Sequence, residues 1–174
     1  MTGAVRALVP LLALLAGCLP ASAPLPAPVA APAFRPEAFF SGRTEGRGTL
    51  VVRGVAPRGL RVESRGAPAP DGTFRLDQTI TFEDGRVQTR TWAMRALGGG
   101  RYTSTLTDAA GEVSAEAVGN AFHIRYRMGR GATMDQRLAL RPDGRTADNV
   151  ATVRILGVPW ARLTETITRL DAGE

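Results

Sequence analysis

Residues 73–95 alternate between apolar and polar side chains on both sides of an Asp-Gly turn. Before the turn, apolar residues recur on one face of an extended segment, and they are Phe74, Leu76, Ile80 and Phe82. This period of two is typical of a strand with one buried face. Asp84-Gly85 supplies the positive φ angles of a tight turn, and the alternation resumes in residues 86–95. The stretch therefore predicts a long β-hairpin.

Shorter segments with the same strand-like pattern lie on both sides of this hairpin. They are residues 49–53, 60–64, 101–107, 112–118, 121–128, 133–140, 149–155 and 160–170. Together they predict about eight to ten strands joined by short turns, with no segment long enough for a crossover helix. Sequential hairpins form an antiparallel up-and-down meander, and its closure into a barrel would remove the exposed edges. We therefore expect an all-β barrel able to hold one small ligand, with an open two-sheet sandwich as the alternative.

Composition agrees with a turn-rich β protein. The 174 residues include 20 glycines and 12 prolines, and residues 37–171 have the usual size of one domain. All 22 basic residues are arginine, and the formal net charge is +6, which favours anionic neighbours such as lipid headgroups.

The N-terminal residues have the pattern of a bacterial lipoprotein signal peptide. Arg6 precedes the apolar run 7–16, which is too short to span a bilayer but suits a secretory signal. Residues 15–18, Leu-Ala-Gly-Cys, resemble a lipobox, in which Cys18 would be lipidated and become the first mature residue. The alternative is ordinary secretion with cleavage after Ala23, although Pro24 would then follow the cut.

This pattern predicts a signal peptide over residues 1–17 and a membrane anchor at Cys18. Cys18 is the only cysteine, so a disulfide within the chain is impossible. Leu19 in place of aspartate resembles the signal for the outer membrane, so we expect a lipid-anchored protein in the cell envelope that faces the periplasm. Residues 18–36 are rich in alanine and proline and predict an extended tether.

Catalytic and metal-binding patterns are weak in this sequence. His123 is the only histidine, and no cluster of His and Cys has the spacing of metal ligands. An enzyme acting on lipid remains an alternative, with Asp108, Glu112, Tyr126 or His123 as acid or base groups. Residues 123–127 alternate basic and aromatic side chains, but export makes nucleic acid an unexpected partner.

Two alternating strands carry the best candidates for ligand binding. Arg90 and Trp92 share one strand face, and residues 122–128 place Phe, Ile, Tyr and Met on another. If both faces point inward, they would line an apolar cavity in which an arginine could bind a carboxylate or phosphate. The alternative is that Trp92 and Tyr126 fill the core and that Arg90 points outward or pairs with an aspartate.

Several motifs in order resemble one bacterial protein family. They are residues 40–48, 76–85, 88–92, 101–102, 108–111, 119–121 and Tyr126. They resemble a lipoprotein-like family catalogued as domain of unknown function number thirty-eight thirty-three, over residues 39–170. The chain departs from it before Asn149, where the family has a segment with acidic residues and Trp and this chain has only Arg141-Pro-Asp-Gly144. If that segment lines the family's ligand site, the site of this protein differs.

The resemblance implies a lipocalin-like barrel and an association with membrane-lipid metabolism. The motif residues Tyr102 and Asn120 then join Arg90, Trp92, Asp108 and Tyr126 as candidate ligand-binding residues. We expect a monomeric lipoprotein whose barrel binds a lipid or another small hydrophobic ligand, without a cofactor or metal. The remaining alternative is a structural or assembly lipoprotein without a ligand.

Overall fold

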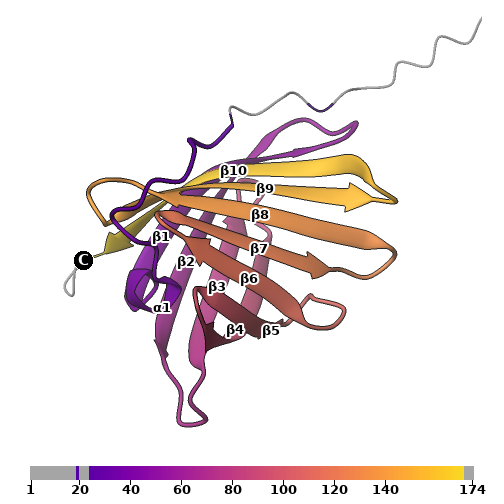
Figure 1. Ribbon diagram of the computed structural model, residues 1–174. Helices are drawn as coiled ribbons and strands as arrows, with labels where there is room; N and C mark the ends of the chain where they lie inside the picture. Colours follow the sequence, from indigo (N-terminus) through magenta and orange to yellow (C-terminus); the bar gives the residue numbers. More distant parts are fainter. Residues whose placement is uncertain (1–18, 20–23, 171–174) are drawn as a thin grey trace, which may run out of the picture.

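The computed structural model describes Leu19 and residues 24–170. These residues form one short helix and ten strands (Figure 1). The elements are α1 (Pro36–Phe39), β1 (Gly42–Val52), β2 (Arg58–Pro68), β3 (Phe74–Phe82), β4 (Val87–Gly98), β5 (Arg101–Leu106), β6 (Val113–Val118), β7 (Ala121–Arg127), β8 (Ala132–Leu140), β9 (Thr146–Ile155) and β10 (Val158–Leu170).

Each strand pairs antiparallel with the next, and β1 pairs with β10 to close the barrel. The closing pair is continuous from Arg43 opposite Leu170 to Val52 opposite Ala161. Because every strand has two neighbours, the barrel has no free edge. The predicted all-β meander barrel is confirmed, and the open sandwich is wrong.

The period of two in the sequence corresponds to the inner and outer faces of the barrel. In β3, Phe74, Leu76, Ile80 and Phe82 are all buried, and the hairpin turn has Gly85 at φ 80° as predicted. In β4 the inward face carries Trp92 and Met94.

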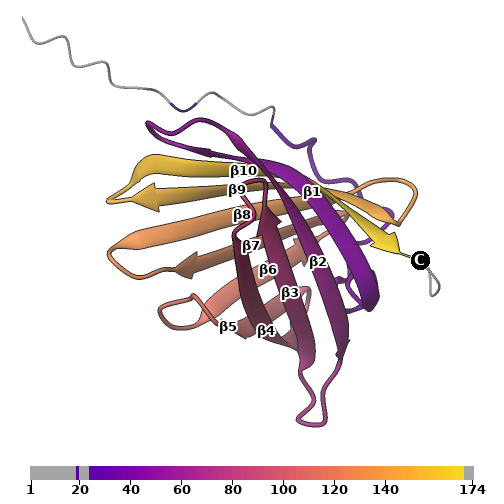
Figure 2. The same cartoon turned by 180° about the vertical axis from the view of Figure 1, so that it is seen from behind.

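Helix α1 lies at one end of the barrel, which Figures 1 and 2 show from opposite sides. Phe34, Phe39 and Phe40 are buried, and the Phe34 ring stacks on Phe122 with 5.4 Å between centroids. Pro36 begins the helix, where its fixed φ is favourable and its missing N–H is not needed. We call this the closed end.

The segment before the helix is held against the closed end by Asn120, which lies in the turn between β6 and β7. The Asn120 amide donates to Leu140 O at 2.8 Å, and its Oδ1 accepts from Val29 N at 2.8 Å. Phe34 N donates to Gly119 O at 2.7 Å. Val29, within the predicted tether, is thus already hydrogen-bonded to the barrel, because Asn120 supplies partners for its backbone. The predicted signal peptide and Cys18 lie outside the described residues.

The opposite end of the barrel is bordered by the turns that follow β1, β3, β5, β7 and β9, and we call it the open end. Among residues 24–170, the structure contains no helix with the length and apolar character to cross a bilayer.

Candidate ligand-binding cavity

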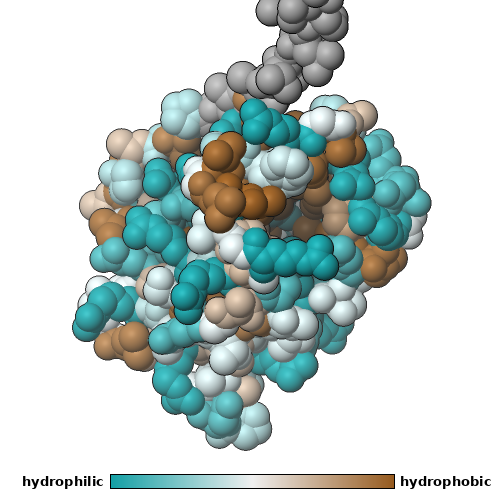
Figure 3. Space-filling view, turned by 90° about the vertical axis from the view of Figure 1, so that its right-hand side faces the viewer, coloured by the Kyte–Doolittle hydropathy of each residue, from teal (hydrophilic) through white to brown (hydrophobic). Residues whose placement is uncertain are grey.

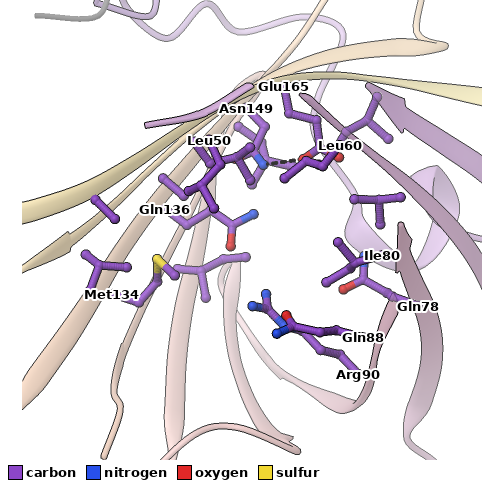
Figure 4. A pocket seen from close by; sticks show the side chains of 18 of the residues that line it. Leu50, Leu60, Gln78, Ile80, Gln88, Arg90, Met134, Gln136, Asn149 and Glu165 are labelled. Atoms are coloured by element: carbon purple, nitrogen blue, oxygen red, sulfur yellow. Dashed lines mark hydrogen bonds between the residues drawn. The ribbon is translucent and has the colours of Figure 1, made fainter. Parts of the chain in front are cut away.

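A cavity of about 300 Å³ lies inside the barrel, between the aromatic cluster of the closed end and the turns of the open end. Its wall is mostly aliphatic and aromatic, with a few polar side chains that point inward (Figure 4). The volume is at the lower end of the range for small-molecule sites. The barrel is therefore hollow and compatible with a small hydrophobic ligand.

The cavity reaches the surface at the open end. Figure 3 looks onto this end and shows a hollow beside hydrophobic side chains, with hydrophilic residues around it. Arg58 and Arg86 line the outer part of the cavity on either side of Phe82, and the Arg86 guanidinium lies 4.6 Å from the Phe82 ring centroid. Both arginines also pair with Asp84, at 3.6 and 3.5 Å. The entrance thus combines an aromatic surface with basic groups.

Trp92 lies on the cavity wall with its polar atom satisfied. The side chain is 6% exposed, and Nε1 donates to Gln78 Oε1 at 2.7 Å. Gln78 Nε2 in turn donates to Ser64 Oγ at 3.1 Å. This chain of hydrogen bonds holds the indole in place and leaves its apolar surface as part of the wall.

Arg90 points into the barrel and is paired there. Its Nε lies 3.1 Å from Asp108 Oδ2, in the turn between β5 and β6. The sequence allowed an inward arginine or an arginine paired with an aspartate, and in the structure both are true. Because Asp108 compensates much of its charge, Arg90 is a weaker anchor for an anionic ligand than an unpaired inward arginine would be.

Tyr126 is buried beside this ion pair. Its ring packs edge-on against Trp92, with centroids 6.1 Å apart, and its hydroxyl has no hydrogen-bond partner. Burial raises the pKa of Tyr126 to about 12, and smaller effects of the Arg90 and Asp108 charges oppose each other. Tyr126 therefore belongs to the packed core next to the cavity.

Glu165 and Asn149 form a second polar group in the cavity wall (Figure 4). They are direct cross-strand neighbours on β10 and β9, and Asn149 Nδ2 donates to Glu165 Oε2 at 2.8 Å. Glu165 is 8% exposed and Asn149 2%. Burial raises the pKa of the Glu165 carboxyl, against smaller lowering effects of the Asn149 hydrogen bond and the Arg90 charge. Glu165 Oε1 and Asn149 Oδ1 are both buried without a partner.

Two glycines of β1 make room for Glu165. Gly48 pairs with Glu165 in the register, and Gly46 is its neighbour on the same inner face. A Cβ on Gly46 would lie 1.9 Å from Glu165 Oε1, and a Cβ on Gly48 would lie 2.9 Å from Glu165 Cβ. The glycine-rich stretch 42–48 thus keeps this part of the wall thin so that a buried carboxyl fits.

Of the six residues predicted to bind a ligand, Arg90 and Trp92 line the cavity. Asp108 pairs with Arg90 and Tyr126 lies near it, but neither residue lines the cavity. Asn120 holds the N-terminal segment. Tyr102 lies toward the closed end, where its hydroxyl donates to Glu37 at 3.2 Å. Burial is the main cause that raises the Tyr102 pKa, followed by the Glu37 charge.

The remaining acid-base candidates lie apart from the cavity. His123 Nε2 is 3.0 Å from Asp135 Oδ2 and 3.1 Å from Arg125 Nε, so the histidine is in a charged cluster on the outer face. The Glu112 carboxylate accepts from the Thr103 hydroxyl on an exposed surface. Within residues 24–170 no group of three or more His, Cys, Asp or Glu side chains could hold a metal ion.

Sequence reasoning missed Glu165. The residue occupies the inward phase of an alternating strand, between Leu163 and Ile167, where an apolar residue is expected. A charged residue in that phase, together with glycines at alternate positions of another strand, is a signal for a buried polar site. Only the pairing of β1 with β10 brings Glu165 next to the glycines of β1.

The sequence of residues 12–161 matches the family described as "Protein of unknown function (DUF3833)". The chain belongs to this family. The predicted family is thereby confirmed, with the lipoprotein assignment remaining a prediction. No curated protein matches the chain significantly in sequence.

Solved structures share the fold of this DUF3833 member. The S-type phycobiliprotein lyase CPES from Guillardia theta superposes with a TM-score of 0.63 at 7% identity, covering 78% of this chain and 91% of that chain. A protein of unknown function of the DUF3598 family from Nostoc punctiforme gives 0.60 at 16% identity, covering 83% and 52%. Rv2717c from M. tuberculosis gives 0.60 at 14% identity, covering 79% and 99%. At these identities the likeness shows the fold alone.

Proposed function

We propose that this protein is a lipoprotein of the cell envelope whose barrel binds a lipid or another small hydrophobic molecule. The observation that carries the proposal is the cavity of about 300 Å³ inside a closed barrel. A packed protein interior has few voids larger than a water molecule, so a space of this size is costly unless it has a use.

The wall of the cavity supports an apolar ligand with a polar end. Ile80, Leu138 and Val153 are among the aliphatic residues of the wall, and Trp92 adds an aromatic surface. Apolar residues outnumber the polar ones in the wall, which is the usual composition of a small-molecule site.

The lipid anchor rests on the sequence. Residues 15–18 resemble a lipobox, and Leu19 favours the outer membrane, so the barrel would work at the periplasmic face of that membrane. The membrane next to the barrel would then be the source of a lipid ligand, which fits the family's expected association with membrane-lipid metabolism. Two or more acyl chains on Cys18 would hold the protein firmly, because each buried CH₂ contributes about 0.8 kcal/mol.

The two alternatives have less support from the same observations. A structural lipoprotein without a ligand needs no cavity and would be expected to have a solid interior. An enzyme needs an acid or base group within reach of a substrate in a shared pocket, and His123 and Glu112 lie outside the cavity.

Native mass spectrometry of the gently purified full chain tests the proposal. We expect an added mass that corresponds to a bound apolar molecule. Ala151→Phe, which fills the cavity, should lose this mass, whereas Val150→Phe on the outer face of the same strand should keep it. If no ligand co-purifies and added alkyl compounds do not bind either, the proposal is wrong.

A further inference from the structure

Glu165 and Asn149 each place a buried oxygen without a hydrogen-bond partner at the cavity wall. A buried acceptor without a partner destabilises the folded state, and here two such atoms belong to neighbouring residues. Their side chains are more than nine-tenths buried and line the cavity. A hydrogen-bond donor on a bound molecule would satisfy one of them.

The glycines of β1 show that this arrangement is built into the strand pairing. Replacement of Gly46 by any other residue would collide with the Glu165 carboxyl, because a Cβ there would lie 1.9 Å from Oε1. A leucine or isoleucine in place of Glu165 would continue the apolar pattern of β10 without any unpaired atom. The chain instead keeps a carboxyl at the wall of an apolar cavity.

Arg90 does not change the preference of the cavity for a ligand that carries a hydrogen-bond donor. Its guanidinium is paired with Asp108 at 3.1 Å, so Arg90 offers an anionic ligand little uncompensated positive charge. A ligand carboxylate near Glu165 would also place its own acceptor oxygens against Glu165 Oε1 and Asn149 Oδ1, with no hydrogen-bond donor between them. Both facts disfavour a free fatty acid.

On the basis of the proposed function, we infer that Glu165 and Asn149 recognise the hydrogen-bond-donating end of an otherwise apolar ligand. The ligand class is an alcohol or amine amphiphile rather than a carboxylate. Its hydroxyl or N–H group donates to Glu165 Oε1 or Asn149 Oδ1, and its alkyl part lies along the aliphatic wall.

Binding of a matched series of decyl compounds to the full chain tests this inference. An alkyl chain of about ten carbon atoms is a probe of matching scale for the cavity. We expect 1-decanol and decylamine to bind about tenfold more tightly than 2-decanone, which has only an acceptor, and than decanoate. Trp92 in the cavity wall makes tryptophan emission a suitable readout.

Two variants give the test its control. Glu165→Gln introduces a side-chain donor at nearly the same volume, so it should abolish the preference for decanol over 2-decanone. Gln88→Leu removes a different polar lining residue and should retain the preference. If all four probes bind equally to the unmodified chain, or Glu165→Gln keeps the preference, the inference is wrong while ligand binding stands. If no probe binds, the proposed function itself fails.

The surface of the open end carries exposed apolar side chains. Four large ones lie in and next to the turn between β1 and β2 and the turn between β9 and β10, and they are Val55, Leu156, Val158 and Trp160. Val87, at the start of β4, is also exposed at this end. Leu156 is 88% exposed at the tip of its hairpin and has φ 49°, which is unfavourable for leucine. Leu156 is therefore not part of the barrel core, and its side chain is free to contact a surface outside the protein.

Three neighbouring turns make up this surface, which we call the apolar rim: residues 53–57, 128–131 and 156–160. They contain Arg53 and Arg130 and no acidic residue. Arg53 N donates to Trp160 O at 2.9 Å, and a Cβ on Gly131 would lie 3.7 Å from Leu156 Cδ2, so the three turns adjoin. Apolar turns whose own charged residues are all arginine are complementary to an anionic lipid surface.

We propose that the apolar rim inserts into an anionic bilayer, so that the open end of the cavity faces the lipid. The full chain is placed in vesicles whose acyl chains carry bromine, which quenches tryptophan on contact. We expect Trp160 to be quenched at least twofold more in vesicles with anionic lipid than in zwitterionic ones. Leu156→Asp and Arg130→Glu should remove this difference.

The matched control is Val118→Asp, which places the same charge on an exposed valine at the closed end and should leave quenching unchanged. Equal quenching of the Leu156→Asp variant and the unmodified chain would overturn the proposal. The proposal would also be overturned if Trp160 is not quenched and the rim variants change the sedimentation of the solubilised protein. The rim would then be a contact between two copies of the chain.

Discussion

Arg90 Nε on β4 lies 3.1 Å from Asp108 Oδ2, and this pair joins the inner wall of the barrel to a turn at its open end. The side chains are 25% and 34% exposed, so solvent weakens their attraction. The pair fixes the direction of Arg90 and reduces its positive charge toward the cavity.

Release of Arg90 from this pair should change ligand preference. In Asp108→Asn the guanidinium loses its anionic partner, so the affinity for decanoate should rise roughly fivefold, about 1 kcal/mol. Calorimetric titration of the full chain measures the change. Glu112→Gln is the control, because Glu112 hydrogen-bonds Thr103 instead of Arg90. An unchanged affinity for decanoate in Asp108→Asn would contradict this view of the pair.

Glu165 should make the barrel less stable as pH rises. Burial raises the pKa of the Glu165 carboxyl above its ordinary value of 4.5, so Glu165 ionises first in the unfolded chain when pH increases. The contribution of the neutral carboxyl to the free energy of unfolding is fully present below the pKa of Glu165 in the unfolded chain. It is lost as pH rises through the pKa of Glu165 in the folded protein. Glu165→Gln should therefore be more stable than the unmodified chain at neutral pH, and the difference should shrink toward pH 4. Urea unfolding at several pH values measures it, and a constant difference would contradict the prediction.

Gly46→Ala should destabilise the barrel by about 1–3 kcal/mol, because the new methyl group collides with the Glu165 carboxyl. The clash needs both side chains, so the cost should fall when Glu165→Ala is also present. Chemical unfolding of the two single variants and the double variant gives the coupling free energy. Simple additivity would show that Gly46 is required for another reason.

Tyr126 should titrate later than an ordinary tyrosine. With its pKa raised to about 12, the absorbance change of phenolate formation should include a step near that pH, and Tyr126→Phe should remove it. Because the folded pKa is raised above 10.0, stability is lost between pH 10.0 and about 12, and the variant should lose less.

The two tyrosines should also differ in their response to loss of the hydroxyl. The Tyr126 hydroxyl has no partner, so Tyr126→Phe should cost little at neutral pH. Tyr102 donates to Glu37, so Tyr102→Phe should cost about 1 kcal/mol in thermal unfolding. Equal costs would be inconsistent with these assignments.

Cys18→Ser should abolish lipid attachment, because acylation needs the thiol. Membrane fractionation and mass analysis should find uncleaved precursor or a soluble chain. The barrel should fold as before, since Cys18 precedes all of its strands and the helix α1. Mature Cys18→Ser chain that stays with membranes in high salt, even when Leu156→Asp is also present, would rule out the lipid anchor.

The alternation of apolar and polar residues was sufficient to predict most of this barrel. A strand with one buried face needs a period of two, and short turns between such strands leave antiparallel pairing as the simple arrangement. Phe74, Leu76, Ile80 and Phe82 follow this pattern and are buried as predicted. Arg90 and Trp92 were found for the same reason, because they share one face of a strand.

The polar part of the cavity was decided by the tertiary structure. Glu165 is near the C-terminal end of the chain and Gly46 near the start of the domain, and only the closure of β1 on β10 places them against each other. Similarly, Asn120 meets Val29 because the turn after β6 lies at the closed end. Local sequence determines which face of a strand is buried, whereas the strand register determines which buried residues meet. Register depends on the whole barrel, because one shift in pairing would change the partners of every inward side chain.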